Sequence, residues 1–330
     1  MRAAIGESDE VKELRTYDRN SENVLCLRDC ANAKEEVLRL FSSQDHLRNE
    51  NKITEVSLEL SKRCDDETVS LIAKRLKKQL RKVNLNASGS GDRGDIEQFS
   101  NLGVMSISEY QEEKLVALEC FWNTKITSAA IESVCRFNTN LVVLNISGCL
   151  AVSEKGLRHI SKLRKLKYLN MTRATHATDV AINEIIEGCT ELEYFNLYAN
   201  SQLSDDAFVN IDRLRNLTFF DACGFNKLSD KTLLKLPLNK LEYLNLSWCG
   251  EIEDAGACFV CENSPNLKLF SVHGNRNVTE EMIDSLKRGQ QKQEKPLEVL
   301  DIKGCLNVKT TDFDALKELF PNLETIKFHT

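Results

Sequence analysis

The chain has 330 residues, of which 42% are hydrophobic and 28% are charged, and its formal net charge is -6 at pH 7. It has no apolar run of the ~18 residues that a membrane-spanning helix needs, which excludes a membrane protein. The acidic charge gives no general attraction to phosphate backbones, so nucleic acid is not an expected partner.

The first 52 residues precede any repeat. Residues 1–20 carry charges of both signs and no apolar stretch, so they are predicted to be a disordered tail without a secretory signal, in a cytoplasmic or nuclear protein. Residues 21–52 contain the apolar groups 24–27 and 37–41 and are predicted to form an N-terminal helical cap.

From residue 53 onward an apolar pattern, L-x-x-L-x-L, recurs at steps of about 26 residues, which is typical of leucine-rich repeats. It begins at Ile53, Leu80, Leu115, Leu141, Leu166, Leu192, Leu217, Leu241, Leu267, Leu297 and Leu323. The pattern predicts an α/β solenoid (horseshoe) of about 10–11 repeats over 53–330, with parallel β-strands on the concave face and α-helices on the convex face. The longer step between Leu80 and Leu115 predicts an inserted loop near 88–114.

The repeat that begins at Leu241 illustrates the structure predicted for the others. Leu241, Leu244 and Leu246 have the spacing of a bend and a short strand whose alternate side chains point into the core. The ninth position holds Cys or Asn, and pairs of a hydroxyl residue and an acid then mark helix starts. The pairs are Ser153-Glu154, Thr178-Asp179, Ser204-Asp205, Ser229-Asp230 and Thr279-Glu280. Most of the 12 cysteines occupy recurring repeat positions, so they are predicted to be reduced, buried thiols.

Cysteines at the ninth position and before the next repeat (Cys135, Cys189, Cys261), with these helix starts, resemble the cysteine-containing leucine-rich repeats of F-box/LRR proteins. The antagonist-of-mitotic-exit-network family is similar too. The stretches 24–29, 241–249 and 320–329 look like one group of F-box/LRR proteins. The resemblance implies a non-catalytic substrate receptor of an SCF ubiquitin ligase, acting in proteasomal degradation, without a cofactor or metal.

One departure from that family leaves alternatives open. Only about 20 polar residues precede the predicted cap, and no F-box is visible in them. Either an F-box lies upstream and recruits a Skp-type adaptor and cullin, or the repeats act without one. The alternative function is a scaffold or inhibitory binding protein in the cell cycle or signalling, and a monomer is expected outside any complex.

The predicted partner site lies on the concave strand face, where positions three, five, seven and eight of each repeat are expected to point to solvent. A protein substrate or degron is the expected ligand, because exposed aromatic side chains give large contact area at low entropy cost. The candidate binding residues are Phe121, Trp122, Tyr168, Arg173, Tyr194, Tyr198, Phe219, Tyr243, Trp248 and His273. The alternative is that such residues are repeat consensus and pack along neighbouring strands.

Two short motifs resemble chemical sites. Residues 89–94 match G-x-G-x-x-G, but no βαβ unit follows, so a flexible insertion is preferred over a nucleotide site. Cys258 and Cys261 form a lone C-x-x-C without a second ligand pair, which is too few ligands for structural zinc. No catalytic residue is predicted.

Overall fold

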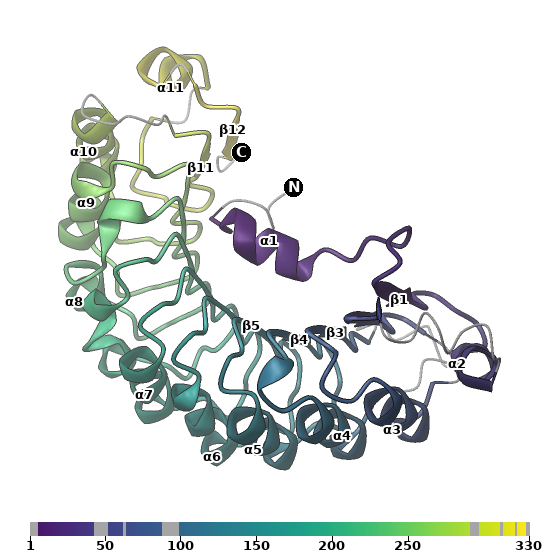
Figure 1. Cartoon of the computed structure of the whole chain (residues 1–330). Coiled ribbons are helices and arrows are strands. Elements are labelled where there is room, and N and C mark those ends of the chain that lie inside the picture. Colours follow the sequence, from purple (N-terminus) through teal and green to yellow (C-terminus); the bar gives the residue numbers. More distant parts are fainter. Residues whose placement is uncertain are drawn as a thin grey trace. The chain divides into compact units, whose positions relative to one another are not determined.

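The computed structural model describes residues 6–42, 52–61, 64–87, 99–290, 297–310, 313–320 and 322–327. The chain divides into two compact units. The N-terminal unit is Asp9–His176, and the C-terminal unit combines Met1–Ser8 with Ala177–Thr330. In each unit short strands line one side and helices the other (Figure 1). The predicted α/β leucine-rich-repeat solenoid is confirmed.

The strands are parallel, three residues long and ordered along the sheet as they are along the chain. The N-terminal unit has β1 (Val24–Cys26), β2 (Glu55–Ser57), β3 (Lys82–Asn84), β4 (Ala117–Glu119), β5 (Val143–Asn145) and β6 (Tyr168–Asn170). The C-terminal unit has β7 (Tyr194–Asn196), β8 (Phe219–Asp221), β9 (Tyr243–Asn245), β10 (Leu269–Ser271), β11 (Val299–Asp301) and β12 (Thr325–Lys327). Equivalent repeat positions pair directly, as Tyr243 does with Leu269.

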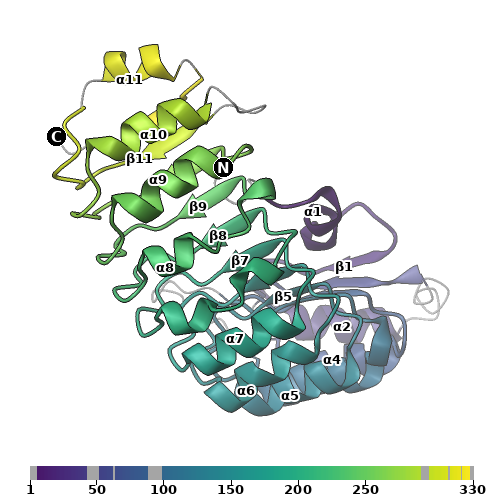
Figure 2. The ribbon, with the colours of Figure 1, turned by 90° about the vertical axis from the view of Figure 1, so that its left-hand side faces the viewer.

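Helices connect the strands, and Figure 2 shows α8 and α9 side by side on the helix side of the C-terminal unit. The N-terminal unit has α1 (Asp9–Arg15), α2 (Ala33–Ser42), α3 (Asp66–Arg75), α4 (Asn101–Gln111), η4 (Glu112–Lys114), α5 (Ser128–Phe137), α6 (Glu154–Arg158) and η5 (His159–Lys162). The C-terminal unit has α7 (Asp179–Gly188), η6 (Asp205–Phe208), η7 (Ile211–Arg213), α8 (Asp230–Leu233), η8 (Leu238–Lys240), α9 (Asp254–Asn263), α10 (Glu280–Gln290) and α11 (Phe313–Leu319). No helix among the described residues is long and apolar enough to cross a membrane.

The hydroxyl and acid pairs join neighbouring repeats as well as starting helices. Ser204 caps η6 by accepting a hydrogen bond from the Asp206 amide, as predicted for a helix start. Its own hydroxyl donates to Asp179 Oδ2 of the preceding repeat at 2.6 Å. Ser229 and Asp205 repeat this contact at 2.6 Å. Asp179 and Asp205 therefore each accept a charge-assisted hydrogen bond from the next repeat, which helps to fix the stacking.

Position nine also links repeats. The Cys249 thiol donates to the carbonyl of Ala222, at position six of the preceding repeat, with a sulfur to oxygen distance of 3.3 Å. Asn275 does the same with its amide, which lies 3.0 Å from the Leu246 carbonyl. The two residue types are interchangeable there because both donate to the same buried carbonyl.

Asn275→Ala is expected to destabilise the protein by about 2 kcal/mol. Its side chain also accepts a hydrogen bond from the Cys249 amide at 2.9 Å, so alanine removes two hydrogen bonds to buried backbone groups, each worth about 1 kcal/mol. Urea denaturation followed by circular dichroism measures the loss. Asn275→Cys is the control and should retain more of the stability, because the thiol restores the donor, and equal losses would contradict this role.

Three boundary predictions need correction. Residues 9–15 of the predicted disordered tail form α1, whose Val11 is fully buried against the unit. Residues 24–26 of the predicted helical cap form a strand, β1, that pairs with β2. The predicted loop near 88–114 contains α4, and Gln111 anchors that helix with its amide 3.0 Å from the Ala73 carbonyl. The glycine motif at 89–94 lies outside the described residues.

Candidate functional site

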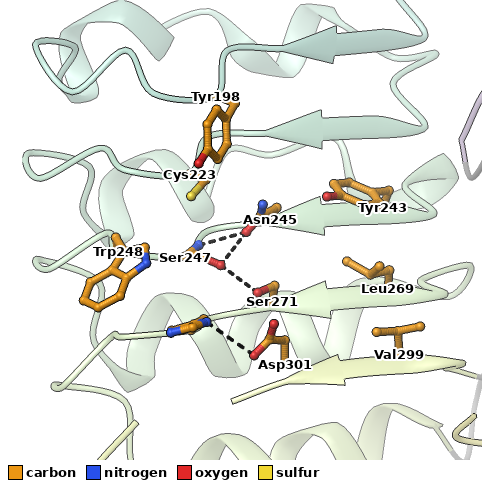
Figure 3. Close-up of a pocket in the computed structure, with 11 residues that line it drawn as sticks. Tyr198, Cys223, Tyr243, Asn245, Ser247, Trp248, Leu269, Ser271, Val299 and Asp301 are labelled. Atoms are coloured by element: carbon orange, nitrogen blue, oxygen red, sulfur yellow. Dashed lines mark hydrogen bonds and ion pairs between the residues drawn. The ribbon is translucent and has the colours of Figure 1, made fainter. Parts of the chain in front are cut away.

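The strand face of the C-terminal unit, formed by side chains at positions three, five, seven and eight, holds a pocket of about 180 Å³. We call it the Trp248 pocket (Figure 3). It is lined by Tyr198, Cys223, Tyr243, Asn245, Ser247, Trp248, Leu269, Ser271, His273, Val299 and Asp301. The predicted binding residues Tyr198, Tyr243, Trp248 and His273 therefore come together.

Trp248 is the most prominent side chain of this pocket, with 55% of its surface exposed. Its backbone lies in the left-handed region (φ +61°), and its ring centroid is 5.1 Å from that of His273. A Cβ atom on Gly274 would lie 2.7 Å from Trp248 Cε3, so the indole packs directly over this glycine. The tryptophan is thus exposed and held in one orientation.

The floor of the pocket is polar and internally hydrogen-bonded. The Ser247 hydroxyl lies 2.6 Å from Asn245 Oδ1 and 2.7 Å from the Ser271 hydroxyl, as Figure 3 shows. His273 Nδ1 lies 3.7 Å from Asp301 Oδ1, close enough for an ion pair when the imidazole is protonated. An aromatic wall beside a carboxylate and hydroxyls can accept a polar or cationic side chain.

The thiol that lines the pocket is held in its neutral form. Burial raises the pKa of the Cys223 thiol to about 12, so this group is neutral at physiological pH and a poor nucleophile. Within the described ranges no cluster of histidine, cysteine or acidic residues could hold a metal ion. Burial likewise raises the pKa of both Cys258 and Cys261.

The aromatic residues at position three are buried, contrary to the expected exposed column. Tyr194 and Phe219 stack with ring centroids 3.9 Å apart, and Phe219 and Tyr243 repeat this distance. Gly6 packs against Phe219, since a Cβ atom on this glycine would lie 2.8 Å from Phe219 Cβ, and the Gly6 carbonyl accepts a hydrogen bond from the Thr218 hydroxyl. Packing along neighbouring strands accounts for aromatic rings at these positions, and partner binding by these residues stays a prediction.

The predicted site residues of the N-terminal unit fall into two groups. Phe121, Trp122 and Arg173 are at least partly exposed, and the Arg173 guanidinium lies 5.4 Å from the Trp122 ring. Tyr168 is buried, because Arg15 of helix α1 lies over it, with the arginine Cζ 4.3 Å from the centroid of the tyrosine ring. The repeat pattern did not predict that Arg15 would lie here, because Arg15 is far along the chain from the residues that it contacts. For example, 104 residues separate Arg15 from its ion-pair partner Glu119.

The sequence contains a pattern at position eight that predicts the fixed orientation of the two tryptophans. Trp122 and Trp248 both have a positive φ, and each is followed one repeat later by a glycine, Gly148 or Gly274. A Cβ on Gly148 would lie 2.6 Å from Trp122 Cδ2, as at the second pair. Tryptophan followed by glycine at this position thus indicates an indole lying flat on the next repeat.

Comparison with known proteins finds a matching family model and curated relatives. A leucine-rich repeat model matches residues 238–259. The F-box/LRR-repeat protein 4 of Bos taurus is 27% identical over 211 residues, which cover 61% of this chain and 33% of the bovine protein. The chain therefore spans about a third of the length of this relative.

Two solved structures are similar in backbone. A chain of the Rad7 and Elc1 complex in yeast has a TM-score of 0.46 and 17% identity, covering 70% of this chain and 72% of that chain. Internalin C2 from Listeria monocytogenes has a TM-score of 0.48 and 16% identity, covering 73% of this chain and 88% of that chain.

Proposed function

We propose that this leucine-rich-repeat protein is a non-catalytic module that binds a protein partner at the Trp248 pocket, as the substrate-recognition part of an SCF-type ubiquitin ligase would. The observation that carries the proposal is the rigid, half-exposed Trp248 beside His273 and a polar floor. The 27% identity to a bovine F-box/LRR-repeat protein supports the link to ubiquitin.

The size of the pocket favours a protein over a metabolite. Small-molecule sites usually enclose roughly 300–1,000 Å³, whereas the Trp248 pocket has about 180 Å³. That volume suits one or two side chains of a larger ligand whose remaining contacts spread over the strand face. A pre-oriented tryptophan loses little entropy on binding, and tryptophan is enriched among the residues that dominate binding energy.

The proposed mechanism is proximity. A receptor raises the effective concentration of its substrate beside the enzymes that transfer ubiquitin, so it needs no reacting groups of its own. A Skp-type adaptor and a cullin are partners under this proposal where an F-box accompanies the repeats. A cytoplasmic or nuclear location is part of the same proposal.

The expected result is that Trp248→Ala strongly weakens partner capture. Affinity purification from proteasome-inhibited cells should recover a substrate together with adaptor and cullin on the wild-type protein. Loss of an interface tryptophan should reduce substrate capture by about 30-fold, since it costs about 2 kcal/mol or more. Leu234→Ala is the matched control, because Leu234 is also half exposed but follows helix α8.

Other outcomes of this purification are equally informative. A substrate retained by Trp248→Ala as well as by the control would contradict binding at the pocket. A Trp248-dependent partner that never brings adaptor or cullin would instead support the alternative, a scaffold or inhibitory binding protein outside the ubiquitin pathway.

A further inference from the structure

Residues 9–17, here called the N-terminal segment, lie on the strand face of the N-terminal unit. Figure 1 shows α1 on the strand side of this unit, opposite α3, α4 and α5. The segment contacts β5, and Val11 is fully buried. A strand face that is expected to bind partners therefore already carries a short helix of the same chain.

Arg15 makes the central contact of this segment. Its guanidinium Nη2 lies 3.3 Å from Glu119 Oε2, and its Cζ lies 4.3 Å from the centroid of the Tyr168 ring. The Glu119 side chain is only 4% exposed and also accepts a hydrogen bond from Asn145 at 3.4 Å. A buried carboxylate beside an aromatic face is complementary to a guanidinium, which pairs with the acid and stacks on the ring.

Lys82 holds the end of the helix. Its ammonium lies 2.9 Å from the Glu13 carbonyl and 2.8 Å from the Thr16 carbonyl, and it pairs with Glu55 at 2.8 Å. A cation at the last carbonyls of a helix is favoured by the negative end of the helix dipole. This contact recognises backbone rather than side chains, so another helix could end at the same place.

The segment is poorly suited to bind permanently. A helix of seven residues is unstable alone, and Val11 is the one buried apolar side chain recorded for α1. The Tyr17 hydroxyl is buried without a hydrogen-bond partner among the described residues. Loss of water around this hydroxyl, with Glu119 and Glu55 nearby, raises the pKa of Tyr17 well above its usual value. Such an unsatisfied group opposes docking.

We propose that Glu119, Tyr168 and Lys82 form a recognition site for a short helical segment of a partner protein that presents an arginine, and that residues 9–17 occupy it in cis. The inference rests on the proposed function, because it assigns the strand face to protein partners. A tethered segment acts at an effective concentration on the order of millimolar. The partner must therefore displace the segment, which makes it a built-in competitor.

The test measures release of the segment and binding of a probe to the same site. The probe is a fluorescein-labelled peptide with the sequence of residues 6–20, and the protein is the full chain. Arg15→Ala should speed hydrogen exchange of the α1 amides by ~10-fold and tighten peptide binding by ~10-fold, because the cis competitor is weakened. Circular dichroism confirms that each variant is folded.

Four matched changes make the result specific. Lys12→Ala alters a basic residue of the same helix whose recorded ion pair is with Asp9 at 3.6 Å, so it should behave as wild type. Tyr17→Phe removes the unpaired hydroxyl and should slow α1 exchange. A peptide in which alanine replaces arginine should not bind, and Glu119→Gln in the Arg15→Ala chain should weaken the original peptide ~10-fold.

The proposal is overturned if Arg15→Ala leaves α1 exchange unchanged, or if the peptide binds wild type and Arg15→Ala equally well. It is also overturned if the arginine-free peptide binds as tightly as the original. These results do not affect capture through Trp248, which is tested with other variants in the C-terminal unit, so the two proposals can fail separately.

Discussion

Leu244→Ala should lower the free energy of unfolding by about 2–5 kcal/mol, because it opens a cavity in a packed core. Leu244 is fully buried in β9, where it pairs with Phe220 of β8 and Phe270 of β10. Both phenylalanines are also fully buried, and the short strands leave little freedom for them to close the space. Urea denaturation followed by circular dichroism measures the change in the midpoint.

The control for this experiment is Trp248→Ala, four residues away in the same repeat. More than half of the Trp248 surface is exposed, and its ring packs against His273. The variant should therefore lower the free energy of unfolding by less than about 1 kcal/mol. If both variants unfold at the same lower urea concentration, the division between core and binding face is wrong.

Alkaline pH should destabilise the protein through its buried thiols. Burial raises the pKa of Cys149 to about 12 and that of Cys249 to about 12, from an ordinary value near 9. Above pH 9 these thiols ionise in the unfolded chain while the folded chain keeps them protonated. Their contribution to stability is therefore complete below pH 9 and is lost as the pH rises toward 12. At pH 10 the free energy of unfolding should be lower by about 1.4 kcal/mol for each thiol than it is well below pH 9.

Melting temperatures between pH 8 and pH 10.5 test this expectation. Cys249→Ser is the matched variant, because serine keeps a donor for the Ala222 carbonyl but does not titrate in this range. Its loss of stability between pH 8 and pH 10 should be smaller than that of wild type by about 1.4 kcal/mol. If stability falls equally with pH in the two proteins, the pKa of Cys249 is not higher in the folded chain than in the unfolded chain, and the prediction is wrong.

The repeat register was predictable, because each repeat solves the same local problem. Leu241, Leu244 and Leu246 are buried as their spacing predicts. Ser204 and Ser229 cap helices where the pattern places them, whereas Ser153 makes no side-chain cap hydrogen bond. The exposed tryptophan at position eight was also predicted as a site residue. What the pattern did not reveal is that the aromatic residues at position three are buried, since Tyr194 and Tyr243 each stack on Phe219 instead of standing exposed on the strand face.

The errors occur where the repeat period is interrupted. Helix α4 lies within the longest step between repeats, so the period gave no register for it, although Ser100 caps it and Gln111 anchors it to the preceding repeat. Strand β1 precedes the first repeat that the pattern identifies, so the sequence predicts a helical cap there instead of a strand that pairs with β2. Composition predicted a disordered tail at residues 9–15 because one buried valine among charged residues carries little signal.

The sequence by itself determined the fold class, the repeat register, the buried leucines and the reduced state expected for the cysteines, because each depends on contacts within a repeat or with its neighbour. Only the tertiary structure decided which strand-face residues are accessible. Arg15 meets Glu119 across 104 residues, and Gly6 meets Thr218 across 212. No periodic pattern encodes such contacts, because they depend on charge and shape matching between surfaces that folding first has to create.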